Sequence, residues 1–385
     1  MTGHHQLEQI ICAHISDAGG FLPFDAFMQA ALYEPELGYY ESKTVFGEAG
    51  DFVTAPELGP WLSLGFADLI FNCWQQLGEP AQWTLLEQGS GSGKLLASVI
   101  NILSQMMPVM PERILSVERS HGLRQRQQVL FDESGVDVAL FGTLDEIEIP
   151  ENIIIYSNEL PDAFPLRCFR YKQGQYYERG VIHRAEGGFE WADAPLPMQH
   201  APDIPQSLSS RWQDGYISEF NPGLPVWQQS LARVVQRGFI LTLDYGYSQQ
   251  EYYRPGRAEG TLLAHLEHKA IDDVLSEPGS RDITAHVNFS ALVQAGRAVG
   301  MEPLLWMSQG GWLAQSPSVQ AFIQSLATQS DAQSLHLLTQ AKRLLMPFGL
   351  GEVFKLLVQS KGLPAQKPAY LKQFDHLDSL LMKDT

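Results

Sequence analysis

A strand, glycine turn and helix pattern at residues 83–103 constrains the fold more than any other part of this sequence. Four largely apolar residues lead into Glu87, and three glycines then follow at every second position: Gly89, Gly91 and Gly93. Residues 95–103 have the apolar composition of a helix. Strand, tight turn and helix form the opening βα unit of a nucleotide-binding α/β domain, because glycine tolerates the dihedral angles and close ligand approach of such a turn.

Three kinds of ligand compete for this turn. A P-loop requires Gly-x4-Gly-Lys-Ser/Thr, but Gln88 stands at its first position and Leu95 at its last, where a hydroxyl would bind Mg²⁺. A dinucleotide turn requires glycine where Lys94 stands. The remaining pattern, Glu-x-Gly-x-Gly-x-Gly, is typical of Rossmann-like methyltransferases that use S-adenosylmethionine (SAM). The turn alone is explained equally well as a Gly/Ser-rich surface loop without a ligand, so further elements have to distinguish the two.

Charge and composition exclude several classes of protein. With 26 Lys and Arg against 44 Asp and Glu in 385 residues, the net charge is −18, which argues against a DNA- or RNA-binding enzyme. We attribute the acidity to solubility rather than to a basic substrate. The three cysteines, Cys12, Cys73 and Cys168, have no CxxC spacing and predict reduced thiols. No apolar run reaches the roughly 18 residues of a membrane span, and the N-terminus carries no targeting pattern, so we expect a cytoplasmic protein without membrane partners.

Two further strand ends supply candidate cofactor contacts. Residues 113–118 form a short apolar strand that ends in Glu118. An acid at the end of the second strand binds the ribose hydroxyls in this fold, although an exposed Glu at a strand end is also common. Residues 136–141 predict the third strand, and the segment 142–145, which includes Leu144, would then line an adenine pocket.

The fourth strand, residues 152–157, runs into a polar segment that contains Asn158, Glu159 and Asp162. This position is where the methyl acceptor lies in SAM methyltransferases. Asn158 can bond to an acceptor nitrogen, and the two acids can orient and neutralise a cationic acceptor. The same residues also suit an ordinary helix start, with Asn158 as the cap and the acids favourable to the helix dipole. The two interpretations are compatible.

The chain order predicts an α/β fold with a Rossmann-like seven-stranded SAM methyltransferase sheet. We expect a helical N-terminal cap over residues 1–80, whose aromatic and acidic loop 39–57 covers the site. Residues 81–165 and 238–385 form the two parts of the SAM-binding core, the second with an active-site loop at 245–288. Residues 166–237, with alternating β-hairpin patterns, form an inserted α+β subdomain on the substrate side. Histidines and acids in the loop 245–288 lack HxH or HxxxH spacing, so we expect no metal.

Together these motifs resemble the MidA-like methyltransferases, a family that includes the mitochondrial complex I assembly enzyme that methylates arginine. The resemblance covers nearly the whole chain and is most specific in three segments: Gly50-Asp51-Phe52, Asn158-Glu159-x-x-Asp162 and Asp282-Ile283-Thr284-Ala285-His286. It implies SAM as cofactor and a protein arginine as acceptor. The candidates for binding the guanidinium and accepting its proton are then Glu159, Asp162 and Asp51, with Asn158 beside them.

The sequence departs from the family pattern on the expected acceptor side. Leu160-Pro161 replaces Phe-Phe, Leu263 replaces an Arg, and Asn288 replaces an Asp. The resemblance therefore supports the cofactor more firmly than the acceptor. Two alternatives remain open: a methyltransferase for a small metabolite, which would favour a closed apolar pocket, and a non-catalytic SAM-binding assembly factor.

Overall fold

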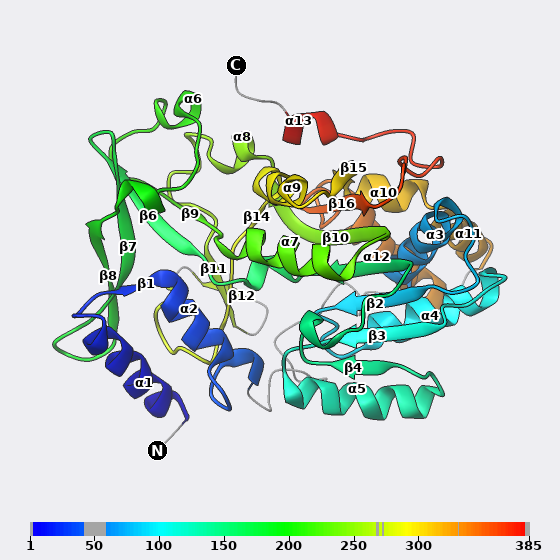
Figure 1. The fold of residues 1–385 in the computed structure, drawn as a ribbon, viewed down its shortest axis with the longest axis horizontal. Helices are drawn as coiled ribbons and strands as arrows, with labels where there is room; N and C mark the ends of the chain where they lie inside the picture. The colour runs from blue at the N-terminus through cyan, green and yellow to red at the C-terminus, as the bar shows by residue number, and fades with distance from the viewer. Residues whose placement is uncertain (1–2, 42–58, 267–268, 272, 330, 382–385) are drawn as a thin grey trace.

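A mixed β-sheet forms the centre of the molecule (Figure 1). The computed structural model describes residues 3–41, 59–266, 269–271, 273–329 and 331–381. Within them the central strands run in the order β15-β16-β10-β5-β2-β3-β4, and short β14 (Val287–Asn288) pairs with β10. Their bounds are β2 Thr84–Gln88, β3 Arg113–Val117, β4 Ala139–Phe141, β5 Ile153–Asn158, β10 Gly238–Tyr247, β15 Glu302–Ser308 and β16 Phe354–Lys361.

The strand directions follow the pattern predicted from the sequence. Strands β4, β3, β2, β5 and β10 are parallel, whereas β16 is antiparallel to both β10 and β15. The central parallel strands β2, β5 and β10 are buried along nearly their whole length, because helices cover both sides of such a sheet. The register places Leu86, Ile155 and Ile240 in one row, and all three belong to the core on one face.

Two groups of helices cover the sheet. One face packs on α3 (Trp61–Gln76), α4 (Lys94–Met106) and the helices α10–α12, in a core that includes Trp61, Phe66 and Trp312. The other face packs on α7 (Gly223–Val234), α9 (Phe289–Ala298) and α13 (Leu377–Leu381). Helix α5 (His121–Ser134) begins at Ser120, whose side chain accepts a hydrogen bond from the Leu123 amide, and ends at Gly135 in the left-handed conformation.

A second, antiparallel sheet joins the N-terminus to the middle of the chain. Its order is β1-β7-β6-β9, with β8 also paired to β7. Figure 1 shows α1 and α2, in blue, beside the green strands β7 and β8. Phe24 and Phe27 of α2 pack against Trp191 and Phe189 of β8. The elements are α1 Gly3–Asp17, α2 Phe24–Tyr33, β1 Leu22–Pro23, β6 Arg167–Lys172, β7 Gln175–His183, β8 Phe189–Pro195 and β9 Tyr216–Phe220.

The structure differs from the sequence predictions in two regions. The expected loop 245–288 contains a small antiparallel sheet of β11 (Leu263–Leu266), β12 (Lys269–Ile271) and β13 (Asp282–Thr284), whose strands are too short for an alternating pattern to be recognised. Residues 309–345, for which no element was predicted, form α10 (Gln309–Gln315), α11 (Pro317–Ala327) and α12 (Ala332–Leu345). Short helices α6 (Gln206–Ser209) and α8 (Gln249–Tyr252) complete the α-helical elements of the described residues.

The described part of the chain contains no helix that is long and apolar enough to cross a membrane.

Candidate active site

A cavity of about 750 Å³ lies at the carboxyl edge of the parallel strands. Ligands of open α/β sheets bind in the crevice outside the carboxyl ends of the strands. The cavity is lined by eight of the residues predicted from the sequence: Glu87, Gly89, Gly91, Glu118, Leu144, Asn158, Glu159 and Asp162. Gly93 lies in the same turn without lining the cavity, and Asp51, with most of the loop 39–57, falls outside the described residues.

The three glycines of the turn are required for different reasons. All have positive φ: +71° at Gly89, +51° at Gly91 and +77° at Gly93. A Cβ at Gly89 would lie 2.9 Å from Leu160 Cδ1, and one at Gly93 would lie 2.9 Å from Phe131 Cζ. A Cβ at Gly91 would meet no protein atom within 4 Å. Gly91 therefore leaves open space against the cavity, whereas the other two glycines allow close packing within the protein.

Glu87 is a buried carboxyl group with an unused acceptor. It is 2% exposed at the end of β2, and its Oε2 has no hydrogen-bond partner among the described residues. Burial, and then the nearby negative charge of Glu118, raise the pKa of Glu87 well above its usual value. A buried acid without a partner is costly, so this position favours a ligand that brings a hydrogen-bond donor or a positive charge.

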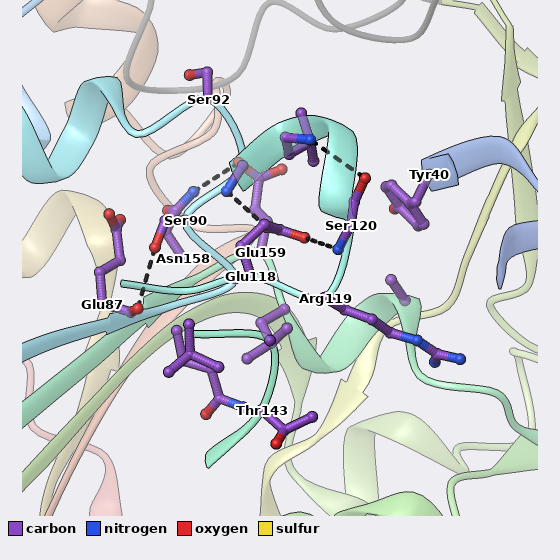
Figure 2. A pocket seen from close by; sticks show the side chains of 18 of the residues that line it. Tyr40, Glu87, Ser90, Ser92, Glu118, Arg119, Ser120, Thr143, Asn158 and Glu159 are labelled. Carbon is purple, nitrogen blue, oxygen red and sulfur yellow. Dashed lines mark hydrogen bonds between the residues drawn. The ribbon is translucent and has the colours of Figure 1, made fainter. Parts of the chain in front are cut away.

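Glu118 connects the glycine turn to the start of α5 (Figure 2). Its Oε2 accepts a hydrogen bond from the Gly91 amide at 3.0 Å, and its Oε1 accepts one from the Ser120 amide at 3.0 Å. Burial raises the pKa of Glu118, while these amide bonds oppose the rise. The carboxylate thus stabilises the turn itself, and each oxygen keeps a further lone pair for a ligand hydroxyl.

The predicted adenine segment lies at one end of the cavity. Gly142, Thr143, Leu144 and Asp145 all line it, and Leu144 is buried. A capping box between Thr143 and Glu146 fixes the local 3₁₀ turn of residues 144–146.

The segment predicted to face the acceptor contains a residue in an unusual backbone conformation. Glu159 has φ +52°, a left-handed geometry that costs a non-glycine residue about 1–2 kcal/mol. Its amide donates to Leu243 O at 2.9 Å, and its Oε1 accepts from Asn158 Nδ2 at 3.1 Å. Asn158 Oδ1 is buried without a partner in the described structure. Strained non-glycine residues cluster at functional sites, and these two side chains lie together on the cavity wall.

Asp162 is positioned by the end of β10. Its amide donates to Asp244 Oδ2 at 3.2 Å, and its Oδ2 accepts a hydrogen bond from the Tyr245 hydroxyl. Its Oδ1 is buried and lacks a hydrogen-bond partner within the described residues. Burial raises the pKa of Asp162 to about 6, although the Tyr245 bond opposes the rise. The sequence also suited the start of an ordinary helix here, but the structure forms only a short 3₁₀ turn, Pro161–Ala163.

Several cavity residues were not predicted individually as site residues, although Tyr40 lies in the loop 39–57 that was expected to cover the site. Tyr33 and Tyr40 stack with ring centroids 5.5 Å apart, and the Arg119 guanidinium lies 4.6 Å above the Tyr33 ring. Asp282, which sequence analysis noted only as a motif residue, also lines the cavity. These residues come from segments far from the glycine turn, so only the fold brings them to the site.

Two of the three departures from the family pattern lie away from the reacting centre. Asn288 caps α9 by accepting a hydrogen bond from the Ala291 amide at 3.1 Å, a role that Asp fills equally well. Leu263 lies in β11 and does not line the cavity, whereas Leu160 does. No group of three or more metal-binding side chains occurs in the described ranges.

Sequence and structure comparisons identify the class of protein. The family model described as "Putative S-adenosyl-L-methionine-dependent methyltransferase" matches residues 66–306, and the chain belongs to this MidA-like family. A Burkholderia thailandensis protein, crystallised with S-adenosyl-homocysteine bound, has 30% sequence identity to this chain. The match covers 98% of this chain and 97% of that one, with a TM-score of 0.87. The fold is therefore that of class I SAM methyltransferases, with an extra antiparallel sheet.

More distant relatives have a more specific description. A Drosophila melanogaster protein named protein arginine methyltransferase NDUFAF7 homolog, mitochondrial, is 24% identical over 94% of this chain and 87% of its own length. A Danio rerio protein arginine methyltransferase NDUFAF7, mitochondrial, is 25% identical over 88% of this chain and 83% of its own length.

The residues of the cavity fit SAM, the cofactor of this family. The unpartnered Glu87 Oε2 suits its ammonium group, and the open space at Gly91 admits its methionine chain. Glu118 has acceptor capacity for the ribose hydroxyls, and Leu144 supplies apolar surface at the adenine end. When bound, SAM supplies a methyl group on a positively charged sulfur, which is already strongly electrophilic.

Gly91→Val should abolish SAM binding, because the new side chain would fill the open space that the cofactor needs. Binding is measured by calorimetry. Gly135→Val is the matched control, since Gly135 also has positive φ, +66°, and also faces open space, but it ends α5 away from the cavity. It carries the same backbone strain and should still bind SAM. Parent-like affinity in Gly91→Val would show that the turn does not contact the cofactor.

Glu118→Ala should weaken SAM binding by about 1.5–3 kcal/mol, the size of a charge-assisted hydrogen bond, which is roughly 10- to 150-fold in Kd. The loss combines the ribose contact with a less rigid turn, because the Gly91 amide loses its acceptor. Comparing SAM with the free methionine portion separates the two effects. An unchanged Kd for SAM would move the ribose site elsewhere.

Proposed function

We propose that this SAM-dependent methyltransferase transfers the methyl group to an arginine side chain of a protein. The observation that carries the proposal is the polar wall beside the glycine turn, where Asn158, Glu159 and Asp162 line the cavity together. Two oxygens of this wall, Asn158 Oδ1 and Asp162 Oδ1, are buried without partners among the described residues. Unused acceptors next to two acids suit a planar cation with several N–H donors, which is the chemistry of guanidinium.

The reaction requires alignment more than activation. The attacking nitrogen has to lie in line with the methyl group and the sulfur, and fixed geometry of this kind lowers the barrier of a two-substrate reaction. Glu159 is suited to this task because its backbone and side chain are both held, by Leu243 O and Asn158. Asp162 is held by Asp244 and Tyr245. Acids fixed before the substrate binds do not have to reorganise when it arrives.

The names of the distant relatives agree with this proposal. At 24–25% identity they support it without establishing the acceptor, and Leu160, one of the residues that departs from the family pattern, lines the cavity. A small-metabolite acceptor and a non-catalytic SAM-binding role predict different outcomes for the same assay. The first would place the label from SAM in small molecules, and the second would bind SAM without transferring its methyl group.

Glu159→Gln should lower methyl transfer by tenfold or more while SAM affinity stays unchanged, because the variant keeps the shape and loses only the charge that faces the acceptor. Transfer is measured as labelled methylarginine formed in lysate protein incubated with methyl-labelled SAM. Glu79→Gln is the matched control, since Glu79 also has positive φ, +55°, and is exposed outside the cavity. It should retain full transfer and full SAM affinity.

If a folded Glu159→Gln variant retained full transfer, the arginine-binding role would be contradicted. The segment 158–162 would then have only a structural role. Label in small molecules instead of protein would replace the proposed acceptor by a metabolite. Thermal unfolding completes the test, because a purely structural role predicts a loss of stability of up to about 1 kcal/mol and no loss of activity.

A further inference from the structure

Asp282 is a buried acid on the acceptor side that the proposed arginine-binding wall leaves without a role. It begins β13, is 4% exposed and lines the cavity. Its strand is tied to the segment of Asp162, because the Ala285 amide donates to Asp162 O at 3.1 Å. On its other side, β13 pairs with β11, with Asp282 opposite His265. The carboxyl group is therefore held beside Asp162 by the backbone of two neighbouring elements.

Tyr40 fixes the carboxyl group of Asp282 from the N-terminal part of the chain. Its hydroxyl donates to Asp282 Oδ1 at 2.7 Å. Tyr40 is itself fixed by stacking on Tyr33, whose hydroxyl donates to Ala163 O at 2.8 Å. A phenol that donates to a carboxyl oxygen stabilises the ionised form of that carboxyl group.

The surroundings of Asp282 give it a high affinity for a proton. Burial, followed by the negative charge of Asp162 and with a contribution from Glu159, raises its pKa to about 8, although the Tyr40 bond opposes the rise. The titratable and charged groups that face this region come from seven different segments of the chain: Tyr33, Tyr40, Arg119, Glu159, Asp162, Tyr245 and His265. An arriving cation would offset the repulsion among these acids and allow Asp282 to be ionised near neutral pH.

We propose that Asp282, held by Tyr40, is the catalytic base that takes the proton released by the acceptor nitrogen during methyl transfer. The inference rests on the proposed arginine acceptor. In the proposed function Asn158, Glu159 and Asp162 bind and orient the guanidinium. Asp282 is a separate group that removes the proton.

The proton and electron balance is complete within the site. A nitrogen–carbon bond forms while the carbon–sulfur bond breaks, and the electron pair of the broken bond stays on sulfur, which becomes a neutral thioether. The guanidinium begins and ends with one positive charge, so one proton has to leave the attacking nitrogen. It moves to the carboxylate of Asp282 and then to solvent.

Asp282 suits this role better than its neighbours. Asp162 and Glu159 already have the proposed task of binding the guanidinium; each accepts one side-chain hydrogen bond, from Tyr245 and Asn158, as Asp282 does from Tyr40. The pKa of Asp162, about 6, is also lower than the value of about 8 for Asp282. A general base works best when its pKa lies near the pH of the reaction and it can keep the proton it receives.

The test is the pH dependence of methyl transfer from labelled SAM to lysate protein, measured as labelled methylarginine. Because the base has to be ionised, transfer by the parent enzyme should rise with pH through the pKa of Asp282 and level off above it. Asp282→Asn should reduce transfer about 100-fold and remove the rising limb, while Asp282→Glu restores part of the rate. Glu277→Gln is the control: Glu277 is an exposed acid of the same segment, paired with Arg281 at 2.9 Å, and the variant should match the parent.

Tyr40→Phe gives an independent readout. Loss of its hydrogen bond should raise the pKa of Asp282 further, so the rising limb should move to higher pH while transfer at the plateau is largely kept. SAM affinity and thermal unfolding are measured for every variant. If Asp282→Asn does not fold, the pH–rate profile of Tyr40→Phe tests the role of Asp282. A rising part of that profile at the same pH as in the parent would overturn Asp282 as the base.

The outcomes separate this inference from the proposed function. Labelled methylarginine from the parent, with an unchanged rate and pH profile in folded Asp282→Asn, would overturn the role of Asp282 alone. A parent enzyme that binds SAM and forms no labelled methylarginine would overturn the arginine acceptor and this inference together. Suppose that Asp282→Asn loses the rising part of the pH–rate profile and that Tyr40→Phe shifts it to higher pH. This result would support both the arginine acceptor and the role of Asp282.

Discussion

Several carboxyl groups that line one cavity are buried away from water, and the rest of this site depends on that constraint. Glu87, Asp162 and Asp282 are each less than one-tenth exposed, and burial is the largest cause of the raised pKa of all three. An isolated buried carboxylate is unstable, so such groups are paired, protonated or reserved for a cationic ligand. SAM carries one net positive charge, and the proposed guanidinium acceptor would bring another to these acids. The positive charge of a ligand thus offsets the unfavourable free energy of burying these acids in the folded protein.

The two ends of the cavity are built from different parts of the fold. The cofactor end uses the carboxyl edge of β2, β3 and β4, the glycine turn and the start of α5. The acceptor end adds Tyr33 and Tyr40 from the N-terminal segment and Asp282 from β13. The N-terminal segment is also attached to the second sheet through β1 and β7. The central sheet is therefore shared with other class I methyltransferases and also carries Asn158, whereas Tyr33, Tyr40 and Asp282 come from segments added to it.

The sequence predicted many of the residues that line the cavity because they are adjacent to strand ends. Each parallel strand delivers its last residues to the same edge, so Glu87, Glu118 and Asn158 converge without any knowledge of tertiary packing. Tyr40 and Asp282 stand 242 positions apart, and no local pattern predicts that they share a hydrogen bond. The positive φ of Glu159 was equally hidden, because glycine is the residue that normally signals this conformation. Helices α10–α12 were missed although all three carry buried side chains that complete the core on one face.

Leu160, which departs from the family pattern, contacts the glycine turn and also lines the cavity. Its side chain lies against Gly89, where even one added carbon would come within 2.9 Å of Leu160 Cδ1. It also stands directly after the strained Glu159 and lines the cavity. A larger side chain at this position has to displace either the glycine turn or the wall that carries Glu159, since packed interiors accommodate added volume poorly. We therefore expect the size of residue 160 to influence the spacing between the glycine turn and the segment that carries Glu159.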